Sequence, residues 1–119
     1  MHASEALTGL ESVGGAQGLK QTYDVLRGRR HYVVASMSRV KRRSGNFNVV
    51  GREAVEATHE SFAGQEAVTS KMVRQRLQRR GVAVEALEAL NILYVLVALG
   101  QARVDRRRSQ RALFFNIAG

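Results

Sequence analysis

The sequence predicts a mainly α-helical protein that ends in a small β-hairpin, and three observations support this fold class. Apolar residues recur at helical spacing over residues 69–80 and again over 84–99. A glycine directly follows each of these stretches, and glycine commonly ends a helix. Two short stretches rich in strand-forming residues, 102–106 and 112–117, flank a polar turn and can pair as a hairpin.

The N-terminal part is predicted to be a flexible N-terminus over residues 1–16, followed by a helical or strand extension over 17–51. Six apolar residues of this extension are spaced at alternating steps of four and three residues, if Arg30 is counted at the one position of the series that is not apolar. This spacing is typical of a helical seam. They are Leu19, Tyr23, Leu26, Val33, Met37 and Val40. A second molecule could pack on such a seam, so the extension is also a possible dimerisation element.

Within the extension, we expect a helix over residues 17–27 and then either a second helix or a strand up to about Val40. The strand remains open because residues 32–34 favour β structure and Gly28 disfavours one long helix. Residues 41–46 form a basic turn in this scheme. Residues 47–50 can then form a short strand.

The second half is predicted to begin with a helix over residues 52–63, in which Val55, His59 and Phe62 share one face. In the next helix, Thr69 or Ser70 can accept a hydrogen bond from the unpaired amides of the first turn. The apolar helix over 84–99 and the hairpin complete the chain.

In this order of elements, residues 52–117 resemble the winged helix-turn-helix superfamily. The resemblance implies a winged-helix domain over residues 52–119, preceded by the N-terminal helical extension. In that superfamily the third helix usually enters the major groove of DNA, and the hairpin, called the wing, contacts the neighbouring backbone or the minor groove. Carried over to this chain, the groove-facing positions would be Glu85, Glu88, Asn91 and Tyr94.

The third helix departs from this pattern in two ways. Its exposed positions include two glutamates, which suit a phosphate-lined groove poorly. Its apolar residues surround more than one face, so the helix needs burial on two sides. The domain's own core would cover one side. The other side would be covered either by residues 17–40 of the same chain or by a second subunit, and the spacing favours neither.

Composition narrows the possible partners. With 19 lysines and arginines against 10 acidic residues, the formal net charge is +9, which favours nucleic acid, an anionic membrane surface or an acidic protein. The apolar run over 86–99 is shorter than the roughly 20 residues of a membrane span. The first 18 residues lack the pattern of a secretion signal, and the chain has no cysteine. We expect a cytoplasmic or nucleoid-associated protein.

The positive charges fall in separate blocks, which we expect to converge on one nucleic-acid-binding face. The first block is the basic turn, the second is the helix from Thr69, and the third is the hairpin. The candidate binding residues are Lys41, Arg42, Arg43, Lys71, Arg74, Arg79, Arg80, Arg103, Arg106, Arg107, Arg108 and Arg111.

Enzymatic chemistry is not predicted. Glu56 and His59 have the spacing of two ligands in carboxylate-bridged metal proteins, but a complete site of that kind needs further ligand helices. His59 is better explained as a partly buried histidine beside Val55 and Phe62. No serine, histidine and aspartate stand in a recognisable nucleophile motif. We therefore expect no catalytic residue, no metal site and no cofactor.

Together these observations predict a DNA-binding protein, either a transcriptional regulator or an accessory DNA-organising protein. A homodimer would present two wings to successive grooves and act by occupying the duplex. Two alternatives remain open. One is an RNA- or ribosome-associated winged-helix protein, and the other is a basic module for protein interaction or assembly.

Overall fold

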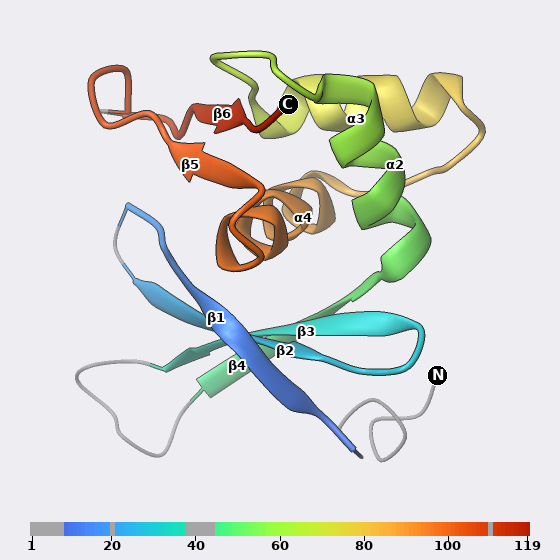
Figure 1. Cartoon of the computed structure of the whole chain (residues 1–119), viewed down its shortest axis with the longest axis vertical. Helices are drawn as coiled ribbons and strands as arrows, with labels where there is room; N and C mark the ends of the chain where they lie inside the picture. Colours follow the sequence, from blue (N-terminus) through green and yellow to red (C-terminus); the bar gives the residue numbers. More distant parts are fainter. Residues whose placement is uncertain (1–8, 20, 38–44, 110) are drawn as a thin grey trace.

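The fold was determined as a computed structural model, which describes residues 9–19, 21–37, 45–109 and 111–119. It is an α+β fold in which a four-stranded antiparallel sheet precedes three helices and a two-stranded ribbon (Figure 1). The elements are β1 (Glu11–Gln17), β2 (Thr22–Arg27), β3 (His31–Met37), β4 (Gly45–Gly51), α2 (Arg52–Phe62), α3 (Ser70–Arg79), α4 (Ala86–Ala98), β5 (Ala102–Val104) and β6 (Phe115–Ile117).

The N-terminal sheet overturns the predicted fold class, because the chain is not mainly α and its extension is not helical. The four strands lie in the order β1-β2-β3-β4, and each pairs with the next in antiparallel register. The helix expected over 17–27 is instead a turn followed by β2, and β1 begins inside the segment expected to be flexible. Of the two alternatives for the segment after Arg27, the strand is the one observed, as β3 over His31–Met37, and residues 38–40 lie outside the described residues.

Alternation along β2 explains the sheet. Tyr23 packs against the core and Val25 is fully buried, whereas the intervening Asp24 is exposed. This period of two places one apolar row against the rest of the protein. The apparent helical seam was misleading because it runs across two turns, each closed by a backbone hydrogen bond: Gly18 N to Gln21 O and Gly28 N to His31 O, both 2.8 Å.

The helices and the ribbon of the second half agree with the predicted segments to within a few residues. Thr69 caps α3, because its hydroxyl accepts a hydrogen bond from Met72 N at 3.2 Å. Gly81 and Gly100 follow α3 and α4 with φ angles of +82° and +75°, the left-handed conformation that glycine adopts without strain. Ahead of α3, Val68 pairs with Phe115 of β6 through two backbone hydrogen bonds, which fixes where α3 begins.

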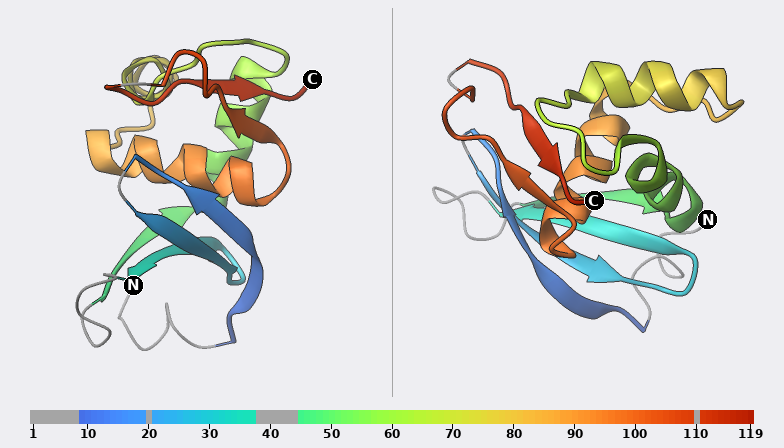
Figure 2. Two further views of the ribbon diagram at one scale, coloured as in Figure 1. Left: turned by 90° about the vertical axis from the view of Figure 1, so that its left-hand side faces the viewer. Right: turned by 45° about the horizontal axis from the view of Figure 1, so that its top comes forward.

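Helix α4 lies in the middle of the molecule, between the sheet and the layer formed by α3 and the ribbon (Figures 1 and 2). It packs against all four strands of the sheet, and Ile92, Leu93 and Leu96 are fully buried. The Tyr94 ring stacks on that of Tyr23 in β2, with 4.4 Å between centroids. The second face of α4 is therefore covered by the chain's own N-terminal half, which answers the question that the sequence left open.

Candidate nucleic-acid interface

Helix α3 is amphipathic, and its outer face is basic. Val73 and Leu77 are fully buried against the core. The exposed side chains of the helix are Lys71, Arg74, Gln75, Gln78 and Arg79. All five carry N–H donors, and α3 contains no carboxylate. Figures 1 and 2 show the helix at the periphery of the molecule, on the far side of α4 from the sheet.

Two further arginines attach α3 to α2 and are not part of this outer face. The Arg76 guanidinium lies 4.9 Å from the centroid of the Phe62 ring and donates to the Ser61 carbonyl at 3.4 Å. Arg80, at the C-cap, donates to the Ser61 hydroxyl at 2.8 Å and lies 4.0 Å from the Glu60 carboxylate. Arg80 was predicted to bind nucleic acid; its side chain is 42% exposed, but it already has these partners.

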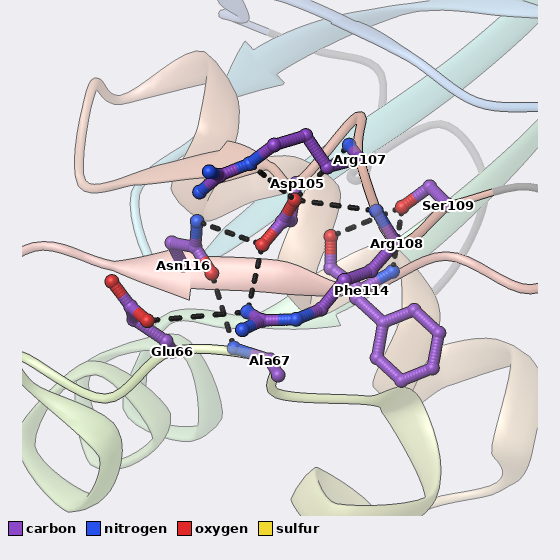
Figure 3. A network of polar contacts seen from close by, with 8 residues as sticks. All are labelled: Glu66, Ala67, Asp105, Arg107, Arg108, Ser109, Phe114 and Asn116. Atoms are coloured by element: carbon purple, nitrogen blue, oxygen red, sulfur yellow. Dashed lines mark hydrogen bonds and ion pairs between the residues drawn. The ribbon is translucent and has the colours of Figure 1, made fainter.

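A buried carboxylate organises the hairpin between β5 and β6 (Figure 3). Asp105 accepts hydrogen bonds from the backbone N–H groups of Arg107 and Arg108, from the Arg108 guanidinium at 2.8 Å and from the Asn116 amide. Burial opposes ionisation of this carboxyl, but the hydrogen bonds and the Arg108 charge outweigh it and lower the pKa of Asp105. The turn therefore holds its shape through an ionised aspartate.

Arg108 is held by carboxylates of the protein itself, whereas the other arginines of the hairpin are exposed. Arg108 is half exposed and also lies 3.9 Å from Glu66, so it bridges the hairpin to the loop ahead of α3. Arg103, Arg106 and Arg111 are exposed, and the Arg107 side chain is 89% exposed although its Nε lies 4.0 Å from Asp105. Arg103, Arg106 and Arg111 can contact phosphates without giving up a carboxylate partner among the described residues, and Arg107 would give up only its 4.0 Å contact with Asp105.

Figure 2 shows α3 and the β5–β6 ribbon on the same side of α4, away from the sheet. These two elements carry two of the three predicted basic blocks: Lys71, Arg74 and Arg79 on α3, and the arginines of the hairpin, of which Arg103 and Arg106 line pockets with Gln17 of β1. The third block, Lys41, Arg42 and Arg43, lies outside the described residues. Sequence reasoning missed Gln75 and Gln78. Their spacing of four and seven residues from Lys71 could have revealed them as part of the same helix face.

The groove-facing role that the resemblance implied for α4 is wrong for two of its four positions. Asn91 is 1% exposed and donates from Nδ2 to the Leu87 carbonyl at 3.0 Å, and Tyr94 is 2% exposed. Glu88 lies in a pocket of about 450 Å³ between α2 and the segment that joins α3 to α4. Burial, and then the neighbouring Glu85, raise the pKa of Glu88. With the sheet on its other side, α4 cannot insert into a groove.

Other kinds of site find less support. Across the described ranges, no group of three or more histidine, cysteine, aspartate or glutamate residues could hold a metal ion. The ring of His59 lies 3.1 Å from the Ala118 carbonyl, so it contacts the C-terminal segment. None of the helices that the structure describes is long and apolar enough to cross a membrane.

Comparison with known proteins gave no match to a family model, to a curated protein or to a solved structure. Its similarity to winged-helix proteins stays a prediction based on the order of elements over residues 52–117.

Proposed function

We propose that this protein binds duplex nucleic acid, and DNA in particular, through contacts from α3 and the β5–β6 hairpin to the phosphates. One observation carries the proposal: α3 presents Lys71, Arg74 and Arg79 from a peripheral helix that contains no carboxylate. Among the described residues, no acidic group lies within 4.0 Å of these three side chains. Lysine and arginine at such positions release counterions when they neutralise phosphates, which favours binding.

Molecular size allows α3 and the hairpin to reach the same stretch of a duplex. The protein measures 36 × 31 × 22 Å, so α3 and the hairpin lie within about one turn of B-form DNA, roughly 34 Å. Seven exposed cations are available: Lys71, Arg74, Arg79, Arg103, Arg106, Arg107 and Arg111. If each contacts one phosphate, the logarithm of the binding constant should fall with the logarithm of salt concentration with a slope of about −6.

The proposed mechanism is occupancy of the duplex, as a regulator or as a DNA-organising protein. It requires no catalytic group. The homodimer expected from the sequence loses its main argument, because the face of α4 that a second subunit would have covered is occupied by the sheet. The proposal is therefore for one copy of the chain bound at each site.

A salt titration tests the proposal. Fluorescence anisotropy would measure binding of the full chain to duplex DNA, single-stranded DNA and double-stranded RNA at several salt concentrations. We expect the duplex DNA to bind most tightly, with the steep slope given above. Preference for RNA in direct competition would replace the proposal with the RNA-binding alternative. Absence of binding to any of the three at low salt would favour the protein-interaction alternative.

A matched pair of variants locates the contacts. Arg74→Ala/Arg79→Ala removes two exposed charges from α3, whereas Arg29→Ala/Arg30→Ala removes two exposed charges from the turn between β2 and β3. Both variants lose the same net charge. The α3 variant should reduce the magnitude of the salt slope by about two, and the control should leave it nearly unchanged. Equal effects would mean that only net charge matters and that α3 is not the contact.

A further inference from the structure

We propose that Gln75 and Gln78 contact base edges in the major groove and give this protein a preference for adenine. This inference rests on the proposed binding of duplex DNA and adds a sequence preference to it. It makes α3 the inserted helix, in place of α4.

The arrangement of side chains around α3 supports this role. Successive residues of an α-helix advance by about 100°, so Lys71, Gln75 and Gln78 fall within a sector of about 60° on the exposed face. Arg74 lies about 40° beyond one edge of this sector, and Arg79 about 40° beyond the other. A helix seated in a groove would therefore point the two amides at its floor and one arginine towards each wall of phosphates.

Amide chemistry and spacing fit adjacent base pairs. Glutamine can donate to N7 and accept from N6 of adenine with one planar group, which lysine and arginine cannot do. Gln75 and Gln78 are separated by about 4.5 Å along the helix axis, close to the roughly 3.4 Å step between base pairs. Within the part of the chain that the structure describes, neither amide has a hydrogen-bond partner, so both are available to a ligand.

The helix is also held firmly enough to position these side chains. Val73 and Leu77 are fully buried, Thr69 caps the first turn, and Arg76 and Arg80 bind α2. Base recognition requires such support, because a side chain on a mobile element loses the geometry that distinguishes one base from another. Exposed glutamines are also good helix formers, and that simpler explanation predicts no sequence preference.

Selection from a random duplex library tests the inference. The full chain would be used at a salt concentration that weakens the phosphate contacts. We expect enrichment of adenine at two neighbouring positions, with a discrimination of roughly 5- to 150-fold for each base. Gln75→Ala/Gln78→Ala should abolish this preference while leaving the salt slope unchanged, because no charge is removed. Alanine favours helix, so circular dichroism should show an intact fold.

Two more variants sharpen the test. Gln75→Glu should move the preference at one position from adenine to cytosine, because a carboxylate accepts from the cytosine amino group. Gln65→Ala, at an exposed glutamine in the loop ahead of α3, should leave the preference unchanged.

The possible failures are distinguishable. Steep salt dependence without an adenine preference would overturn this inference and leave the proposed function standing. The same holds for a preference that survives in Gln75→Ala/Gln78→Ala. No binding to duplex DNA at low salt would overturn both.

Discussion

Helices α3 and α4 are neighbours in the chain, but they differ in how much of their surface other elements cover. α4 packs against the sheet on one side and against α2, α3 and β5 on the other, so seven of its residues are buried. α3 buries only Val73 and Leu77 and leaves a continuous polar face in solvent. The apolar helix supports the structure, and the amphipathic helix is the one able to present side chains to a partner.

This difference shows that order along the chain does not decide which helix is exposed to solvent. By element order, α4 is the third helix of the C-terminal half and the position from which a groove would be contacted. The four-stranded sheet covers that position and leaves α3 as the exposed basic helix. Because the sheet covers α4, the candidate interface lies on the preceding helix, α3.

The largest effect is expected from a substitution that creates a cavity beside α4. Ile92 is fully buried, so Ile92→Ala should lower the free energy of unfolding by about 2–5 kcal/mol, measured by urea denaturation. Gln75→Ala, on the exposed face of α3, is the matched substitution and should change stability by less than about 0.5 kcal/mol. Similar losses at the two positions would contradict the difference in burial.

The next effect concerns the contact between α4 and the sheet. A Cβ atom at Gly14 of β1 would lie 2.6 Å from the Ala98 carbonyl oxygen, and φ at this glycine is +150°. Gly14→Ala should therefore cost roughly 1–3 kcal/mol through strain and displacement of the strand. Gly51→Ala is the control, because a Cβ atom there meets nothing within 4 Å. Unaltered stability of Gly14→Ala would mean that β1 is not seated on α4.

A third comparison separates the arginines of α3 by their role. Arg76→Ala should lower stability by about 1 kcal/mol, because it removes the contact with the Phe62 ring. Its effect on the salt slope of DNA binding should be slight. Arg79→Ala should do the reverse and reduce the slope by about one without a measurable loss of stability. Thermal unfolding and fluorescence anisotropy of both variants measure these effects. A loss of stability in Arg79→Ala, or a smaller salt slope in Arg76→Ala, would contradict the assignment.

The smallest effect depends on pH. Because burial raises the pKa of Glu88 above 4.5, the folded state binds a proton more tightly than the unfolded state. The stability contributed by this group is thus present at low pH and is lost as pH rises through the raised pKa. Glu88→Gln removes the cost of the buried charge, so it should raise the melting temperature slightly at pH 7. At pH 4, where both side chains are largely neutral, the difference should shrink or disappear.

The helices could be predicted because the signals for each lie within a single element. Three signals are local: the glycines that end α3 and α4, the Thr69 cap and the apolar spacing within each helix. They placed the ends of these helices to within a few residues. The hairpin is likewise formed by the two predicted stretches, and the alternation of its second strand buries Phe115 and Ile117. Local patterns decide such features without knowledge of the rest of the fold.

The strand expected over residues 47–50 is part of β4, but β1 and β2 were missed, because the residues of β2 satisfy two periodicities at once. Tyr23 and Leu26 fit a helical step, but only the alternation of buried Val25 with exposed Asp24 corresponds to the observed packing. Gly28, which disfavoured one long helix in the sequence, marks a tight turn in the structure: a Cβ atom there would lie 2.5 Å from the His31 ring.

The candidate site was predictable only in part. Exposure of Lys71, Arg74 and Arg79 follows from the amphipathic pattern of one helix. Arg80 and Arg108 also lie close to Glu60 and Glu66, which belong to other segments of the chain, and no local pattern reveals these two pairings.

The position of α4 also has a consequence for biosynthesis. The sheet is encoded first, and the helix that covers its apolar face is encoded only at residues 86–98. During translation, the side chains that pack against α4 in the core, among them Val25, Val34 and Val50, are exposed until α4 has been synthesised. A nascent chain that stalls before α4 emerges would thus expose the apolar face of the sheet, the kind of surface that aggregates and that chaperones bind.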